Sequence, residues 1–292
     1  MFFRTDMAIE RRDLYKNANK IEKEINGVEC EEEKLDDITI TRVKITNNEG
    51  EKALKKGVGD YITIDTKKIN NITEEKQQRI IGVFSKELSK IIDKHIKKDD
   101  EILVIGLGNL HSTPDSLGSK VIDNIEITRH IKLYLPDAID KNERSISAFS
   151  PGVLGTTGIE TAEIVKGIVE NIKPKLVIAI DSLCSKNVER ISKSIQISDT
   201  GIVPGGGVEN KRMELSKDTL GIPVIAVGIP TVVDAATVVI DTLNMSNIKI
   251  EEERLIREMN LNNFNFVVTP KEIDELVENM SFIISEGINL SF

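Results

Sequence analysis

Three short apolar runs stand out in the middle of the chain, each followed by a polar or glycine-rich stretch and then by a helix-like segment. They are Ile102–Ile105, Leu176–Ile180 and Pro223–Val227. Runs of this length are typical of strands that are buried on both faces of a parallel sheet. The pattern therefore predicts an α/β fold with a mostly parallel central sheet and helices on both of its faces.

Functional groups in such sheets gather in the crevice at the carboxyl ends of the strands. This rule directs attention to the loops expected to start at Gly106, Asp181 and Gly228. Ser194–Ile197 is a further, weaker strand candidate.

The N-terminal part of the chain has a different pattern. Residues 16–60 are rich in Lys, Glu, Asp and Asn, and within them Ile38–Ile45 alternates between apolar and polar positions as a strand does. Tyr61–Ile64 is another short strand candidate. We expect an N-terminal extension that is β-rich or mobile and forms a peripheral surface region.

Two amphipathic helices are expected outside the strands. The first begins after Thr73, its N-cap, and repeats apolar residues at helical spacing through Ile80, Leu88 and Ile96. The second runs from Pro270 onward. Core packing explains the stripe of the first helix without a functional role.

Composition narrows the classes of protein. With 39% apolar and 30% charged residues, the chain has the balance of an ordinary folded globule. No apolar run approaches the roughly 20 residues of a membrane span, and the start lacks the apolar stretch of a secretory signal, so we expect no membrane and a cytoplasmic location. A net charge of −9 argues against nucleic acid as a direct partner and suits a basic protein.

The two cysteines, Cys30 and Cys184, are far apart in the sequence and are interpreted as reduced thiols. A Cys184 nucleophile needs a His base, and nothing in the sequence pairs it with His95, His111 or His130.

The stretch from Gly106 to Gly118 contains closely spaced glycines, as a dinucleotide-binding loop does. The third glycine of that fingerprint falls on His111, so the fingerprint fails and a nucleotide site is disfavoured. Asp115 stands where a helix is expected to start, and its ordinary interpretation is an N-cap.

Asp181 follows an apolar strand, where burial of a carboxylate is unfavourable unless it is paired or lies in a cleft. Two carboxylates that meet at neighbouring strand ends share one proton, so one activates water while the other polarises a carbonyl. Spacing alone leaves this pairing open. Asp199, in an isolated Asp-Thr-Gly triplet, is expected to be structural and to line the same cleft.

Many blocks together, in order, resemble one family: the germination proteases, related in fold to hydrogenase maturation proteases. The blocks are Val104–Asn109, Thr113–Gly118, Thr128–His130, Pro151–Val153, Thr157–Thr161, Ile178–Leu183, Ile195–Gly201, Asn210–Arg212, Glu214–Ser216, Leu220–Ala226 and Pro230–Ala235.

This resemblance implies an aspartic-type endopeptidase whose two catalytic residues are Asp115 and Asp181. It also implies a cleft supported by residues of the same blocks, which are Gly106, Gly108, Asn109, Gly118 and Asp199. The hydrogenase maturation relatives bind a metal through three carboxylate or His ligands. No third ligand is evident here, so we expect neither a metal nor another cofactor.

The resemblance further implies a homotetramer in the spore core that degrades small acid-soluble spore proteins during germination. The family is made as a self-processing zymogen and cuts after an acidic residue, before a hydrophobic residue followed by Ala. Asp6-Met7-Ala8 has that form, so residues 1–6 are the expected propeptide and 7–292 a single catalytic domain. Phe3 departs from the pattern, because an acidic residue is preferred four positions before the cut.

Two other functions stay open from the sequence. One is a metal-assisted peptidase like the hydrogenase maturation relatives, which bound metal would identify. The other is a nucleotide-binding or purely structural α/β module, favoured if the Asp115 and Asp181 carboxyl groups lie far apart.

Overall fold

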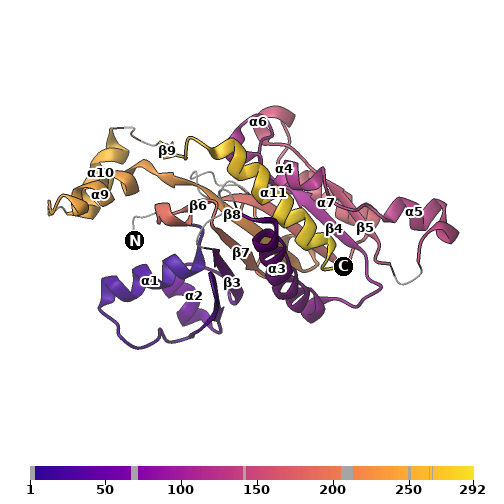
Figure 1. Cartoon of the computed structure of the whole chain (residues 1–292), viewed down its shortest axis with the longest axis horizontal. Coiled ribbons are helices and arrows are strands. Elements are labelled where there is room, and N and C mark those ends of the chain that lie inside the picture. Colours follow the sequence, from indigo (N-terminus) through magenta and orange to yellow (C-terminus); the bar gives the residue numbers. More distant parts are fainter. Residues whose placement is uncertain are drawn as a thin grey trace.

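The computed structural model describes residues 4–66, 72–140, 143–204, 213–248, 251–262, 264 and 266–292 (Figure 1). The helices are α1 Ala8–Asn19, α2 Asn48–Leu54, α3 Glu74–His95, α4 Leu117–Ile122, α5 Arg129–Tyr134, α6 Leu154–Thr157, α7 Thr161–Ile172, α8 Lys217–Leu220, α9 Ala235–Met245, α10 Glu252–Leu261 and α11 Ile273–Asn289, with short 3-10 turns η1 Thr113–Asp115, η2 Pro136–Ala138 and η3 Val188–Arg190. The strands are β1 Val28–Leu35, β2 Ile38–Ile45, β3 Gly59–Thr66, β4 Ile102–Gly106, β5 Ile146–Phe149, β6 Leu176–Ser185, β7 Ser194–Ser198, β8 Val224–Asp234 and β9 Val267–Val268.

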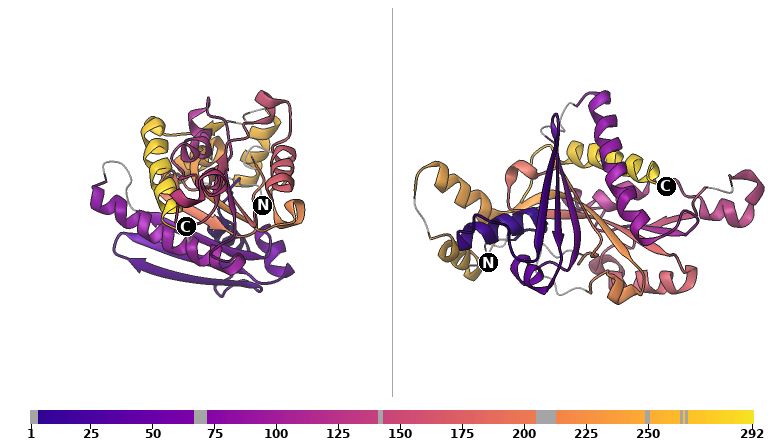
Figure 2. Two further views of the ribbon diagram at one scale, coloured as in Figure 1. Left: turned by 90° about the vertical axis from the view of Figure 1, so that its right-hand side faces the viewer. Right: turned by 90° about the horizontal axis from the view of Figure 1, so that it is seen from below.

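All of these strands belong to one sheet, in the order β1-β2-β3-β7-β8-β6-β4-β5, with β9 paired to β8. The core strands β5, β4, β6 and β8 run parallel, as the apolar runs predicted. The N-terminal extension is β-rich: β1, β2 and β3 continue the sheet through antiparallel pairs, and β3 joins β7. Figure 2 shows the β1–β2 hairpin at the periphery of the molecule.

One face of the sheet is covered by helices along its length. Apolar side chains of α3, α4 and α11 pack there against alternate strand residues, such as Val104 and Ile178, in the largest core cluster. Phe84 of α3, which is fully buried, lies beside Gly287 of α11, so the two long helices approach closely. In Figure 1 they lie in front of the sheet.

The opposite face is covered at two places. Val165 of α7 packs against Leu103 of β4 and Val177 of β6. These two strand residues alternate with those that face the first layer of helices. At the other end, α1 and α2 cover β2 and β3 around Leu54 and Tyr61. The middle of this face, over β6, β8 and β7, lies between the two covered areas.

Most elements expected from the pattern are confirmed. The strands at 38–45 and 61–64, the helix capped by Thr73, the β7 strand and the C-terminal helix are all present. The loops expected at Asp181 and Gly228 are wrong, because β6 and β8 run on past both residues, which pair with each other. Polar residues can continue these two strands because each hydrogen-bonds to the other beyond the end of β4. None of the helices in the described ranges is both long and apolar enough to span a lipid bilayer.

Candidate active site

The connection from β4 to α4 is packed so closely that only glycine fits at three positions, Gly106, Gly108 and Gly118. A Cβ atom on Gly106 would lie 2.2 Å from the carbonyl oxygen of Gly118. A Cβ atom on Gly118 would lie 2.4 Å from the Leu107 oxygen and 2.6 Å from the Ile180 oxygen. Gly106 and Gly118 therefore let α4 approach the backbones of β4 and β6.

The same connection turns Asp115 back toward the strand end. Gly108 has φ +99°, and the backbone N–H of Asn109 donates to both the carbonyl oxygen and Oδ2 of Asp115, each at 2.9 Å. The hydroxyl of Thr231 on β8 fixes the neighbouring residue by donating to the Pro114 oxygen at 2.6 Å. The expected N-cap role of Asp115 is wrong: the residue preceding α4 is Ser116, and Asp115 ends the η1 turn.

Asp181 is the first residue of β6 beyond the end of β4. The pairing of β4 with β6 ends at Gly106 and Ile180, and the next residue, Asp181, pairs with Gly228 of β8. The residue is buried, with 4% of its surface exposed, and its Oδ1 accepts the Ser182 N–H at 2.9 Å.

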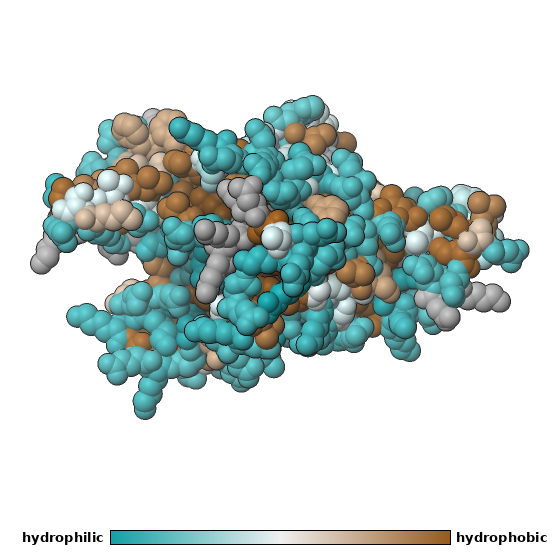
Figure 3. All heavy atoms as spheres, viewed as in Figure 1, coloured by the Kyte–Doolittle hydropathy of each residue, from teal (hydrophilic) through white to brown (hydrophobic). Residues whose placement is uncertain are grey.

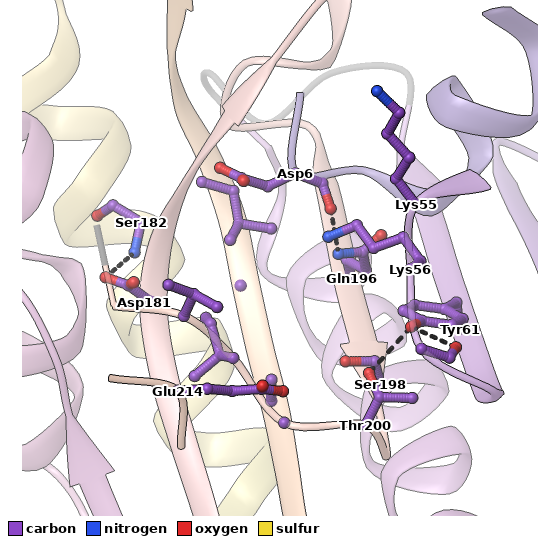
Figure 4. A pocket seen from close by; sticks show the side chains of 17 residues that line it. Asp6, Lys55, Lys56, Tyr61, Asp181, Ser182, Gln196, Ser198, Thr200 and Glu214 are labelled. Carbon is purple, nitrogen blue, oxygen red and sulfur yellow. Dashed lines mark hydrogen bonds between the residues drawn. The ribbon is translucent and has the colours of Figure 1, made fainter. Parts of the chain in front are cut away.

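Both aspartates line one cavity of about 440 Å³ at this edge of the sheet. Gly108 and Asn109 also line it, together with Ser112, Thr161 and Thr231. A second cavity, of about 380 Å³, lies over the middle of the open face, between β3, β7, β8 and β6 (Figure 4). Asp6, Asp181, Ser182 and Leu183 line both cavities, so the two adjoin along β6.

The N-terminal segment lies where the cavities adjoin. Asp6 donates its N–H to the Cys184 oxygen at 2.8 Å, and its Oδ2 accepts the Cys184 N–H at 2.8 Å. The Asp6 carbonyl oxygen accepts a hydrogen bond from Gln196 Nε2 at 3.1 Å. Met7 and Ala8 are fully buried. Asp6 is therefore paired with the end of β6, Met7 has an extended backbone as the N-cap of α1, and Ala8 begins that helix.

Positive charge faces Asp6 inside the second cavity. The side chain of Lys56 points into this cavity (Figure 4), and within the described residues its ammonium group forms no hydrogen bond or ion pair. Burial lowers the pKa of Lys56, and the attraction of Asp6 opposes that shift without cancelling it. Burial also lowers the pKa of Arg11, again against the attraction of Asp6.

A second carboxylate fastens the start of α1 to the loop after β6. Glu10 is buried and accepts hydrogen bonds from Ser185 Oγ at 2.6 Å, Lys186 N at 2.7 Å and Asn187 N at 3.1 Å. It also accepts one from the Thr5 hydroxyl, and Arg190 Nε lies 3.5 Å from Oε1. This set of donors satisfies the carboxylate away from water.

Asp199 lies outside the lining of both cavities. Its Oδ1 accepts the Asp60 N–H at 2.8 Å and its Oδ2 lies 3.4 Å from His95 Nε2, so the side chain joins β3, α3 and the end of β7. The neighbouring Thr200 and Gly201 do line the second cavity.

The thiol of Cys184 is buried, and burial raises its pKa to about 12, which is the reverse of what a nucleophile needs. Within the ranges that the structure describes, no three His, Cys, Asp or Glu side chains form a group able to hold a metal ion. Residues 1–3 of the expected propeptide and the block Asn210–Arg212 lie outside the described residues.

Sequence reasoning missed Gln196, Lys56 and Glu10. Gln196 was available as a signal, because it is a polar residue between Ile195 and Ile197 in a strand. Lys56 and Glu10 stand among other charged residues, and nothing in the local pattern distinguishes them from solvated side chains.

The matching family model and the relatives found by sequence agree on one family. The family described as germination protease matches residues 6–250. The germination protease of Caldanaerobacter subterraneus is 47% identical, over 99% of this chain and 93% of that protein, and the one of Clostridium acetobutylicum is 46% identical, over 99% and 94%. The germination protease of Bacillus mycoides is 37% identical, over 98% and 92%. A solved NiFe hydrogenase maturation protease from Thermococcus kodakarensis matches with a TM-score of 0.34 and 14% identity, over 68% of this chain and 98% of that one.

Proposed function

Since the chain belongs to the germination protease family, we propose that it is an aspartic-type endopeptidase made as a self-processing zymogen. Its substrates are small acid-soluble spore proteins, degraded in the spore core during germination. Family membership decides against the nucleotide-binding or purely structural module that the sequence left open.

The observation that carries the proposal is the cavity that Asp115 and Asp181 share with Asp6. The ionised member of the pair accepts a proton from water as the water oxygen bonds to the carbonyl carbon. The protonated member hydrogen-bonds to the carbonyl oxygen. As the C–N bond breaks, the leaving nitrogen takes up one proton from the pair, and the products are a carboxyl group and an amine.

The contacts of residues 6–8 support the expected substrate pattern. The acidic side chain of Asp6 accepts a hydrogen bond from the Cys184 N–H and is attracted by the positive charges of Lys56 and Arg11. The next side chain, Met7, packs against Leu183 in an apolar cluster. Ala8 is fully buried in an apolar cluster with residues of β2 and β3, which favours a small side chain there. We infer that a substrate binds with acidic, hydrophobic and Ala residues in these same places.

In this proposal, the chain's own N-terminal segment keeps the zymogen inactive. Asp6 lines both cavities and is bonded to β6 and β7, so a substrate cannot enter along the same path. Cleavage between Asp6 and Met7, followed by departure of residues 1–6 and withdrawal of Met7 and Ala8, opens the cleft to a substrate.

A homotetramer is also part of the proposal. Apolar residues are exposed at both ends of the molecule, and Figure 3 shows brown surface over α5 and over α9 and α10. The most exposed are Tyr134 and Leu135 at one end, and Met245, Leu261 and Phe266 at the other. Contiguous exposed apolar surface of this kind is typical of protein–protein contacts.

The proposal is tested by N-terminal sequencing of the intact chain after incubation at mildly acidic pH. We expect a new terminus at Met7, absent in Asp115→Asn and Asp181→Asn variants that keep their thermal unfolding temperature. Asp199→Asn should still process, because Asp199 lies outside the cavities. Near-normal processing by Asp181→Asn would refute the aspartate pair. Activity that is lost on chelation and restored by a divalent metal would favour the metal-assisted peptidase.

A further inference from the structure

Gln196 is a buried polar residue in the strand β7, between the core residues Ile195 and Ile197. The sheet register places it in one row with Gly228 of β8 and Asp181 of β6. Paired residues on neighbouring strands point to the same face, so the side chains of Gln196 and Asp181 start from the open face on either side of Gly228.

The side-chain amide of Gln196 bonds to the N-terminal segment at two points. Its Nε2 donates to the carbonyl oxygen of Asp6 at 3.1 Å, and its Oε1 accepts the N–H of Ala8 at 2.7 Å. The two bonds lie on either side of the Asp6–Met7 peptide bond. They also fix the amide orientation, because a flipped amide would set donor against donor and acceptor against acceptor.

We propose that Gln196 is a catalytic residue that clamps the peptide bond to be cut. Its Nε2–H donates to the carbonyl oxygen before that bond, and its Oε1 accepts the second N–H after it. This inference rests on the proposed cleavage after Asp6 and adds a group that the aspartate pair does not supply.

The chemistry of the bond explains the need for such a donor. When the water oxygen bonds to the Asp6 carbon, negative charge develops on the carbonyl oxygen, and the Nε2–H is already aimed at that atom. The bond to Ala8 holds the leaving side, so the Met7 nitrogen stays in place while it takes up its proton. After the C–N bond breaks, the oxygen held by Gln196 belongs to the new carboxyl group.

Both hydrogen bonds of Gln196 to the described part of the segment go to main-chain atoms, whereas the side chain of Asp6 is held by the Cys184 N–H. The clamp therefore fits any sequence that follows the same path, and it fixes which peptide bond lies beside Gln196. Selection of the sequence is left to the side-chain contacts.

Two variants separate the donor from the acceptor. Gln196→Met removes both, and Gln196→Glu keeps an oxygen for Ala8 but loses the donor. In both we expect self-cleavage of the intact chain to slow by about 10²- to 10³-fold. On the chain that starts at Met7, kcat for the peptide Arg-Thr-Asp-Met-Ala-Ile-Glu should fall by the same factor. KM should change much less, because Cys184 still holds the acidic residue.

The control is Gln78→Met, an equal change at an exposed position of α3, which should leave both rates within about twofold of the parent. Hydrogen exchange of the Ala8 amide reports on the clamp without any activity. Protection at Ala8 should fall in Gln196→Met and remain in Gln196→Glu, in chains that also carry Asp181→Asn to prevent cleavage.

A parental kcat in folded Gln196→Met, or unchanged Ala8 exchange in that variant, would overturn the inference. A fall in kcat in Gln196→Met that Gln196→Glu does not share would also overturn it, because the donor would then be dispensable. A parent chain that cleaves neither itself nor the peptide would refute the proposed function and the catalytic role together. Ala8 exchange would still distinguish that result from absence of the clamp.

Discussion

Replacement of Gly118 by Ala tests whether α4 packs on the strand backbones as closely as the site requires. The added Cβ would lie 2.4 Å from the Leu107 oxygen, 2.5 Å from the Leu107 nitrogen and 2.6 Å from the Ile180 oxygen. All three are backbone atoms of the central sheet and its first loop, so no side-chain rotation relieves the overlap. The helix must move outward by roughly 1 Å to restore ordinary contact distances.

Two opposing effects set the magnitude. Such overpacking destabilises the fold by about 1–3 kcal/mol, here toward the upper end because Leu117 and Val121 of α4 are fully buried and move with the helix. Alanine in place of glycine within a helix stabilises the fold by up to about 1 kcal/mol, because alanine has the higher helix propensity. We expect a net loss of about 2 kcal/mol.

Gly167 on α7 provides the matched control. It is exposed, and a Cβ atom there meets no atom within 4 Å, so Gly167→Ala should stabilise the chain by about 0.5–1 kcal/mol. Urea unfolding followed by circular dichroism should therefore separate the two variants by about 3 kcal/mol. Because η1 carries Asp115 directly before α4, self-cleavage of Gly118→Ala should also slow, by roughly 10²-fold for a shift near 1 Å. Equal stabilisation by both substitutions would refute the close packing.

Two further outcomes follow from charge and burial. We compare two peptides that differ only in having Asp or Asn before the cut. Lys56→Met should reduce the ratio of their kcat/KM values by about tenfold, through the Asp peptide and with little change for the Asn peptide. An unchanged ratio would exclude Lys56 from recognition. Since recognition needs the charged ammonium and burial lowers the pKa of Lys56, the preference should decline as pH rises through that lowered pKa. Iodoacetamide at pH 8 should label half-buried Cys30 and spare buried Cys184, whose pKa is raised to about 12, with no loss of activity. Labelling of Cys184 in the folded chain would contradict this.

The core of the fold was predictable because its signals are local. The runs at 102–105 and 176–180 are apolar on both faces of their strands, as a sheet covered on two sides requires. The extension of β6 through Asp181 was not predictable, because the partner that supports it is β8, which follows more than forty residues later in the chain. The local pattern predicts that a strand ends at its first polar residue, whereas the hydrogen-bond ladder between β6 and β8 continues past Asp181.

The same distinction holds for the site. Asp115 and Asp181 stood out because each is a carboxylate beside an apolar strand or a glycine-rich turn. Gln196 reaches the cleft because β7 pairs with β3, and Lys56 reaches it through the turn after α2. The partners of both residues are distant in the sequence, so the local pattern does not reveal these contacts.

The Glu10 carboxylate also determines what remains when residues 1–6 leave. Of its hydrogen-bond donors only the Thr5 hydroxyl departs, while Ser185, Lys186 and Asn187 stay, so the start of α1 keeps its attachment to the loop after β6. The Met7 nitrogen now bonds to that same Thr5 hydroxyl, at 3.1 Å. In the processed chain the Glu10 carboxylate would be the point at which α1 stays attached. Met7 and Ala8, no longer joined to Asp6, would leave the places that a substrate takes.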